Sequence, residues 1–274
     1  MLTPGNLTFA SVAELTTSDG VRLHYVLTGH RDAPRLVLLH GLGSDAVADD
    51  PLAAAIGSRL SLARLDLRGH GASEPLTDPA RYGWFGRGAR DVVELMDALG
   101  WEDATVSGGS LGAATAVATA LAFPGRVRAL GVCGPAIGAG PRLGNPVAVG
   151  FMDGVVEHGL VPLLEQLAAA MPEVLPPAEL AQARANYGRQ DEAAMRACVA
   201  GLRDAQLLGS FDELRAIEVP ALVVGRRGDV LHPWALACEF AAHLPNARLV
   251  EDNGPEPLYL RPDAFADLLV DLAD

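Results

Sequence analysis

Lysine is absent from this chain of 274 residues, so arginine supplies every permanently cationic side chain. The basic residues number 21 and the acidic ones 34, which gives a formal net charge of −13 at pH 7. A chain of this sign is repelled by the phosphates of nucleic acid and by anionic membrane surfaces. We therefore expect neither nucleic acid nor a membrane as a partner.

Cysteine is scarce, with only Cys133, Cys198 and Cys238, widely spaced and without a C-x-x-C pair. That usage predicts reduced thiols and a cytoplasmic protein rather than a disulfide framework. The N-terminus has no basic segment leading into an apolar run, and no apolar run reaches membrane-spanning length, so neither a signal peptide nor a membrane span is expected. Metal-ligand spacing and a Gly-Lys-Ser/Thr phosphate loop are also missing, which predicts no metal and no cofactor.

What the chain does contain is an alternation of strands and helices. A Ser-Asp-Gly turn separates two alternating stretches, 7–17 and 22–28, which predicts a hairpin at a sheet edge. The apolar run 35–39 is typical of a parallel strand covered on both faces. Further strands are expected at 61–66, 103–107, 127–133, 220–224 and 247–250. Helices are expected between them at 52–60, 92–99, 111–123 and 233–243, with a closing helix around 265–272. The fold class is therefore α/β, with a mainly parallel sheet covered on both sides.

The pattern changes between residues 135 and 208, where strand-like runs vanish. Helical segments take their place at 146–158, 161–170, 177–187 and 191–202. We interpret 135–208 as an inserted helical cap, and 1–134 with 209–274 as the core into which it is inserted.

One tight turn organises the core, the stretch Gly108-x-Ser110-x-Gly112 between an expected strand and an expected helix. Glycines at these places remove Cβ atoms that would clash, and the turn holds the serine hydroxyl out at the end of the sheet. The N-terminus of the following helix favours negative charge developing nearby. The pattern predicts a nucleophile elbow.

Four motifs in order resemble the α/β-hydrolase family, in its cap-bearing branch, over nearly the whole chain. They are His40-Gly41, Asp66-x-Arg68-Gly69-x-Gly71-x-Ser73, the Ser110 elbow, and Gly225-Arg226-Arg227-Gly228-Asp229. The resemblance implies roles for single residues: Ser110 as nucleophile, the backbone amides of Leu42 and Leu111 as oxyanion donors, and Asp229 as the acid of the triad. Gly41 and Gly109, beside those donors, are expected to border the substrate.

The family's catalytic histidine is missing. Its stretch resembles Gly-His-x-Pro-x-x-Glu-x-Pro, and here it is Gly254-Pro255-Glu256-Pro257-Leu258-Tyr259-Leu260-Arg261-Pro262. Pro255 takes the place of the histidine and Leu260 that of the glutamate, and no histidine follows His243. Loss of a triad member costs several orders of magnitude in rate.

His232 is the best replacement, because it follows Asp229 by three residues at the carboxyl end of a strand, where α/β sheets place their sites. A histidine that caps the helix starting at Pro233 remains an equal alternative. The remaining histidines have structural interpretations: His24, His30, His40, His70, His158 and His243. Three carboxylates surround position 255, and we expect them to be solvated loop charges: Glu251, Asp252 and Glu256.

Three functions stay open. The first is a serine-hydrolase-like enzyme that acts on an ester or thioester, with Ser110, Asp229 and His232 as its catalytic residues. The second is a lyase, cyclase or isomerase on the same scaffold, in which the oxyanion site polarises a carbonyl. The third is a non-catalytic protein that binds a small molecule. The expected partner is a small-molecule carbonyl compound, and the sequence does not predict the oligomeric state.

Overall fold

The computed structural model describes residues 8–140, 144–170 and 176–274. Its centre is an eight-stranded sheet in the order β1-β2-β4-β3-β5-β6-β7-β8. The β1–β2 and β2–β4 pairs are antiparallel and the other pairs are parallel. The strands are β1 (Thr8–Thr16), β2 (Arg22–His30), β3 (Arg35–Leu39), β4 (Ser61–Leu65), β5 (Ala104–Gly109), β6 (Val127–Cys133), β7 (Ala221–Gly225) and β8 (Ala247–Glu251). The expected mainly parallel sheet and its edge hairpin are confirmed.

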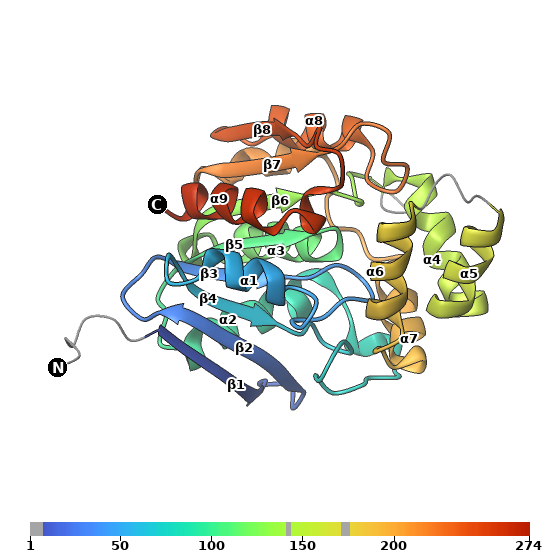
Figure 1. Cartoon of the computed structure of the whole chain (residues 1–274), viewed down its shortest axis with the longest axis horizontal. Coiled ribbons are helices and arrows are strands. Elements are labelled where there is room, and N and C mark those ends of the chain that lie inside the picture. The colour runs from blue at the N-terminus through green and yellow to red at the C-terminus, as the bar shows by residue number, and fades with distance from the viewer. Residues whose placement is uncertain (1–7, 141–143, 171–175) are drawn as a thin grey trace.

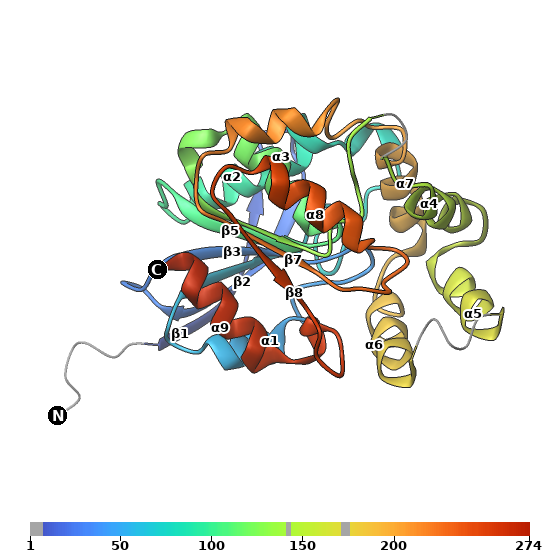
Figure 2. The same ribbon diagram turned by 90° about the horizontal axis from the view of Figure 1, so that it is seen from above.

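Helices cover both faces of the sheet (Figures 1 and 2). One face carries α1 (Asp50–Ile56) and α9 (Pro262–Ala273); the other carries α2 (Ala89–Ala98), α3 (Leu111–Ala122) and α8 (Trp234–His243). Strand β3 shows why its sequence is apolar throughout. Val37 and Leu39 point into the core on one face, while Leu36 and Leu38 point into the core on the other. A strand buried on both sides has no position for a polar residue.

Helix α3 lies against the middle of the sheet because its residues are small. A Cβ atom at Gly112 would lie 2.1 Å from the Leu39 carbonyl oxygen, so only glycine permits this approach. This contact ties the start of α3 to the end of β3, and so places Ser110 beside the turn that begins at His40.

Four helices lie beyond the carboxyl ends of the parallel strands (Figures 1 and 2). They are α4 (Pro146–His158), α5 (Leu160–Ala170), α6 (Pro177–Tyr187) and α7 (Glu192–Leu202). Asn145 begins α4 by accepting hydrogen bonds from the amides of Val147 and Ala148, at 3.1 and 3.4 Å. The four helices occur where the sequence predicts them, while the division of the chain at 134/135 and 208/209 stays a prediction.

Within the described residues, no single helix is long and apolar enough to cross a membrane. Helices α4 and α5 pass a test of length and composition only as a pair, and they meet at 120°.

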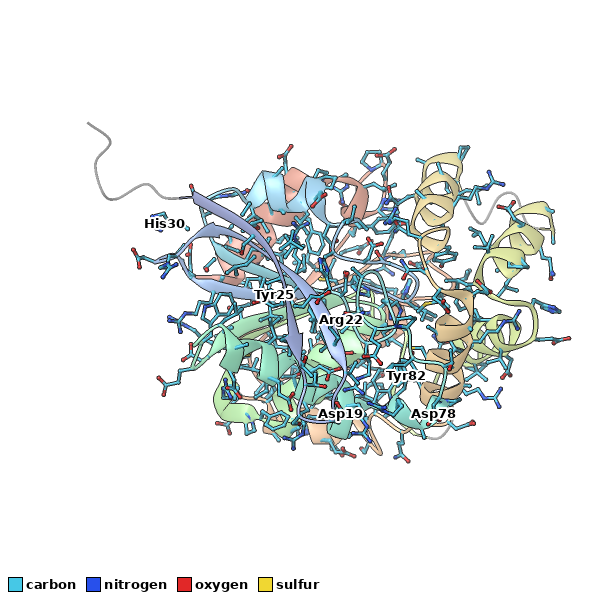
Figure 3. All side chains as sticks on the ribbon, turned by 90° about the horizontal axis from the view of Figure 1, so that it is seen from below. Asp19, Arg22, Tyr25, His30, Asp78 and Tyr82 are labelled. Carbon is cyan, nitrogen blue, oxygen red and sulfur yellow. The ribbon has the colours of Figure 1, made fainter. Side chains whose placement is uncertain are left out.

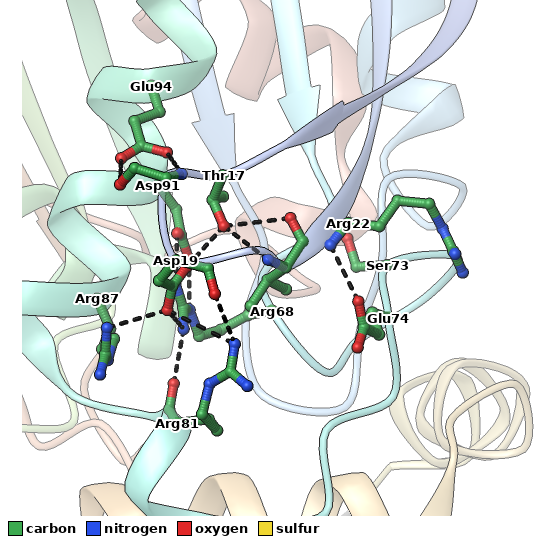
Figure 4. A network of polar contacts seen from close by, with 12 residues as sticks. Thr17, Asp19, Arg22, Arg68, Ser73, Glu74, Arg81, Arg87, Asp91 and Glu94 are labelled. Carbon is green, nitrogen blue, oxygen red and sulfur yellow. Dashed lines mark hydrogen bonds and ion pairs between the residues drawn. The ribbon is translucent and has the colours of Figure 1, made fainter.

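Two residues of the Asp66-x-Arg68 loop hold the fold rather than line the site. Arg68 makes two hydrogen bonds to buried Asp91, at 2.7 and 2.6 Å, and a third, at 3.2 Å, to Asp19 (Figure 4). Asp66 accepts the amides of Ala46 and Ala72, at 2.6 and 2.9 Å. The bond from the Ala46 amide to Asp66 fastens the loop after β3 to the loop after β4, and the bonds of Arg68 hold the second loop to α2 and to the β1–β2 turn.

Short helical turns complete the chain, at Pro79–Arg81, Trp84–Gly88, Pro124–Arg126, Phe211–Ala216 and Leu258–Leu260. Strand β2, which lies between the edge strand β1 and β4, runs from Arg22 to His30, and His30 lies at the side of the molecule opposite α4–α7 (Figure 3). His30 therefore lies away from the strand ends that face α4–α7, which agrees with its structural interpretation.

Candidate active site

A cavity of about 470 Å³ lies between the carboxyl ends of the strands and helices α4, α6 and α7. Its walls include apolar side chains of α4 and α7, among them Phe151, Met152, Val199 and Leu202. All seven residues that the sequence predicts for the site line this cavity: Gly41, Leu42, Gly109, Ser110, Leu111, Asp229 and His232. The structure thus brings together residues almost 200 positions apart in the chain.

Ser110 has the conformation of a strained elbow. Its φ is 52° and its ψ is −110°, and in the described ranges it is the one non-glycine residue with positive φ. Its amide donates a 3.0 Å hydrogen bond to the Cys133 carbonyl of β6, which holds the turn in place. Backbone strain of this kind costs about 1–3 kcal/mol and persists where the surrounding structure enforces it. Such strain is what a nucleophile elbow requires.

The two predicted oxyanion donors have amides available for a ligand. Leu111 is the first residue of α3, so its N–H has no partner inside the helix. The N–H of Leu42 makes no hydrogen bond to any described residue. His40 holds the turn that carries Leu42, because its Nε2 accepts the Leu67 amide at 3.0 Å and its Nδ1 lies 2.8 Å from the Gly41 carbonyl. Burial lowers the pKa of His40, so this imidazole is a neutral support.

Asp229 and His232 form a pair at the cavity wall. One oxygen of Asp229 lies 3.0 Å from His232 Nδ1, and the other accepts the amides of Leu231 and His232, at 3.0 and 2.9 Å. Burial opposes ionisation of Asp229, but the hydrogen bonds from His232 hold its pKa below the usual value. Nε2 of His232 is buried and has no hydrogen-bond partner among the described residues.

The alternative role for His232, as a helix cap, is not what the structure shows. The residue before α8 is Pro233, which makes no side-chain cap bond. Asp229, rather than His232, satisfies the free amides of this turn. Nδ1 of the imidazole is therefore paired with Asp229, and Nε2 has no partner among the described residues.

Ser110 and His232 are near each other without a direct bond. A Cβ atom built at Gly134 would lie 3.5 Å from the His232 ring, and Gly134 follows Cys133, which accepts the Ser110 amide. No described residue hydrogen-bonds to the Ser110 hydroxyl. Catalytic hydrogen bonds are often long before substrate binds, and one water molecule can bridge such a gap.

Position 255, where the family would carry its histidine, lies outside the cavity. Pro255 is exposed and does not line the walls, whereas Pro257, Leu258 and Tyr259 do. The loop between β8 and α9 thus presents its apolar part to the site.

The expectation that all three nearby carboxylates are solvated is wrong for Asp252. Asp252 is buried, accepts the Leu258 amide at 2.8 Å and pairs with Arg226 and Arg261. A carboxylate buried with two guanidinium partners is a structural support rather than a base. Glu251 is exposed and pairs with Arg227 at 2.9 Å, as a surface charge.

Several polar residues that line the cavity were not predicted from the sequence, among them Asp49, Glu179 and Tyr259. The Tyr259 hydroxyl donates a 3.0 Å hydrogen bond to Glu179 of α6, which links the last loop to the helices beyond the sheet. Burial raises the pKa of Asp49 to about 7. The short Leu-x-Leu run gives no sign that Tyr259 borders a cavity, and Asp49 resembles an ordinary helix-starting acid ahead of Pro51.

In the part of the chain that the structure describes, no group of three or more histidine, cysteine or acidic side chains is placed to hold a metal ion. The three cysteines carry free thiols. The prediction that no cofactor is needed therefore stays a prediction.

Residues 34–260 match the model of the alpha/beta hydrolase fold family, and the chain belongs to that family. The resemblance inferred from the four motifs is thereby confirmed. So is the fold class, because the enol-lactonase from Burkholderia xenovorans LB400 superposes with a TM-score of 0.78 at 28% identity, over 95% of this chain and 99% of that one.

Relatives with assigned activities match along different lengths. A 2-hydroxy-6-oxononadienedioate/2-hydroxy-6-oxononatrienedioate hydrolase of Cupriavidus pinatubonensis is 31% identical over 86% of this chain and 85% of its own. The acetyltransferase component of the acetoin cleaving system of Cupriavidus necator is 31% identical over 58% of this chain, but the match spans only 41% of that relative. The hydrolase of Cupriavidus pinatubonensis and the enol-lactonase confirm the expectation of a hydrolase-class enzyme at the level of class.

Proposed function

We propose that the chain is a serine ester hydrolase acting on a small-molecule ester or thioester, with Ser110 as nucleophile, His232 as general base and Asp229 as its orienting acid. The observation that carries this proposal is the unpartnered, buried Nε2 of His232 in the cavity that Ser110 also lines. An imidazole that donates Nδ1–H to a carboxylate keeps its lone pair on Nε2. That tautomer, assigned here from the hydrogen bonding, is the one that a general base needs.

In the proposed reaction, the Ser110 hydroxyl loses its proton to His232 Nε2 through one bridging water and attacks the carbonyl carbon. The amides of Leu42 and Leu111 receive the negative charge that develops on the carbonyl oxygen; donors of this kind contribute roughly 3–4 kcal/mol each. Collapse of the intermediate expels an alcohol or thiol, which takes the proton from His232. Water then attacks the acyl-Ser110 ester with His232 again as base. The bond between the acyl carbon and the Ser110 oxygen breaks, His232 returns the proton to that oxygen, and the acid leaves.

The relatives support an ester-like substrate in general terms. The structural neighbour from Burkholderia xenovorans is an enol-lactonase, and a lactone is a cyclic ester. The 31% identical relative is named as a hydrolase. Neither name fixes the substrate of this chain, whose cavity is shaped by residues of α4, α6 and α7.

A lyase, cyclase or isomerase on the same scaffold is the alternative, followed by a non-catalytic binding protein. One observation favours both over hydrolysis: the Ser110 hydroxyl has no hydrogen-bond partner among the described residues. A cytoplasmic location and the absence of a cofactor remain parts of the proposal that rest on the sequence.

Covalent labelling separates these functions. A fluorophosphonate probe at pH 8 should modify Ser110, as located by peptide mass spectrometry, and Ser110→Ala should abolish the modification. With p-nitrophenyl acetate, His232→Ala should lower kcat/KM by about a thousandfold or more, the scale of a triad member. His158→Ala is the control, because His158 ends α4, is partly exposed and does not line the cavity.

Folded protein that is neither labelled nor active would refute the hydrolase and leave the lyase or binding function. Activity that depends on Ser110 but survives His232→Ala unchanged would refute His232 as the base while keeping the nucleophile.

A further inference from the structure

Asp49 contributes a carboxylate to the cavity wall, and no described residue forms a hydrogen bond or ion pair with it. It precedes α1, where an aspartate commonly caps the helix, yet its side chain makes no cap bond. It is half-buried, and it lines the same cavity as Ser110.

The charged groups around Asp49 are already paired with others. Arg64 is buried, and its Nη1 donates hydrogen bonds to the Ala46 carbonyl, at 2.7 Å, and to Asp50, at 2.6 Å. The neighbouring acid Asp45 is held by Arg189, and Asp66 by backbone amides and His24. Arg64 attracts Asp49 electrostatically and its Nε has no hydrogen-bond partner among the described residues, yet no hydrogen bond or ion pair joins the two side chains. Burial and these neighbouring acids together raise its pKa to about 7, against the attraction of Arg64.

Among the described residues that line the rest of the cavity, the one arginine is already bonded to other groups. This arginine is Arg226, and its Nη1 bonds to Asp252 and to the carbonyls of Gly254 and Glu256, at 3.4, 3.1 and 3.1 Å. Glu179 already accepts the Tyr259 hydroxyl. An anionic ligand would therefore find no free cation here, whereas a cationic one would find Asp49.

We propose that Asp49 is a specificity-determining residue, which makes the pocket select small esters or thioesters that carry a protonated amine. The ester part of this inference rests on the proposed function, and the amine part rests on Asp49 alone. The ammonium group would lie against the Asp49 carboxylate, and the hydrocarbon part against apolar walls such as Phe151 and Met152. The substrate would thus differ from the dicarboxylate after which the Cupriavidus pinatubonensis hydrolase is named.

Binding of simple ligands tests this without hydrolysis. Hexylamine (protonated at pH 8), hexan-1-ol and hexanoate share one chain and differ in charge. Isothermal titration at pH 8 should give at least tenfold tighter binding of the amine than of the alcohol, with hexanoate weakest. Asp49→Asn, checked for folding by circular dichroism, should abolish the difference between amine and alcohol. Glu179→Gln is the matched control, a second cavity carboxylate that is already partnered, and should keep it.

The wild-type protein offers a second test that needs no variant. Because Asp49 is half-protonated near pH 7, the preference for the amine should shrink between pH 8 and pH 6, where hexylamine itself stays protonated. Equal binding of amine and alcohol at pH 8, or a preference that Asp49→Asn retains, would overturn the proposal. If the amine preference appears but Ser110 is never acylated, the hydrolase proposal fails and the recognition by Asp49 stands; ester hydrolysis without the preference gives the reverse.

Discussion

Arg189 holds Asp45 by both carboxylate oxygens, with Nε 2.7 Å from one and Nη2 2.9 Å from the other. Asp45 is buried three residues after Leu42, while Arg189 lies between α6 and α7. The same carboxylate accepts the Ala48 amide at 2.9 Å. A planar, two-point ion pair fixes orientation as well as distance. It therefore fastens the turn with the predicted oxyanion donor to the helices that close the cavity.

Removal of this clamp should affect both stability and activity. We expect Arg189→Ala to lower the free energy of unfolding by about 1–3 kcal/mol, because a buried carboxylate loses its charged partner. Loosening of the Leu42 turn should also lower kcat/KM for p-nitrophenyl acetate several-fold. Urea unfolding and steady-state kinetics measure the two effects.

Arg184→Ala is the matched control for that experiment. Arg184 makes an equally short two-point pair with Glu165, at 2.7 and 2.6 Å, but both side chains are exposed on α5 and α6. Exposed ion pairs contribute little to stability. If the two variants behave alike, Arg189 does not fix the turn.

The strained backbone of Ser110 gives a second prediction. Ser110→Gly should be more stable than Ser110→Ala by about 1 kcal/mol, because glycine adopts a φ of 52° without a Cβ penalty. Both variants lose the hydroxyl and should lose fluorophosphonate labelling. Denaturant midpoints at equal slope compare them. An alanine variant as stable as the glycine variant would mean that the turn relaxes once the serine is gone.

Local sequence patterns predicted most of the fold. They also predicted those site residues that belong to recognisable motifs. The apolar run 35–39 became a strand buried on both faces, and 146–158 and 177–187 are helices with those bounds. The pairing of Asp229 with His232 followed from a spacing of three residues at a strand end. Each of these depends on neighbours in the sequence, which a pattern records.

Contacts between distant segments were not predictable in the same way. Nothing near Asp252 in the sequence reveals that Arg226 and Arg261 enclose it, so its burial was missed. Asp49 stands before a proline-started helix, where an acid is ordinary, and only the arrangement of β3 and α1 turns it toward the cavity. Which side of a turn faces a pocket is decided by tertiary packing, and a single sequence does not contain that information.

The raised pKa of Asp49 predicts a pH-dependent stability. In the unfolded chain its pKa is near 3.8, and in the folded protein it is about 7. Between these values the folded state binds more protons than the unfolded state, so stability falls as pH rises from about 4 to 7. Asp49→Asn should therefore stabilise the protein at pH 8 relative to wild type and change it least near pH 4. Asp91, whose pKa burial raises to about 6, contributes a fall of the same sign in both proteins. Unfolding curves of both proteins at pH 4, 6 and 8 test this, and a pH-independent difference would contradict it.

Restoring a histidine at the family's position should not create a strong esterase. Position 255 is exposed and outside the cavity lining, so the imidazole of Pro255→His would begin on the wrong side of the loop. Asp229, its required orienting partner, is already bonded to His232. Misplacement by about 1 Å can cost ~100-fold in rate. We therefore expect kcat/KM for p-nitrophenyl acetate to stay within a few-fold of wild type.

Two further variants decide what that result means. Pro255→Ala controls for the loss of a rigid residue from the loop, and Pro255→His combined with His232→Ala frees Asp229 for the new ring. If the single histidine variant rises about a thousandfold, on the scale of a triad member, then His232 is not the base and the wild-type site merely lacks one. If activity instead falls with His232→Ala and the added histidine does not rescue it, His232 is the general base, at a different position in the chain from the family's histidine.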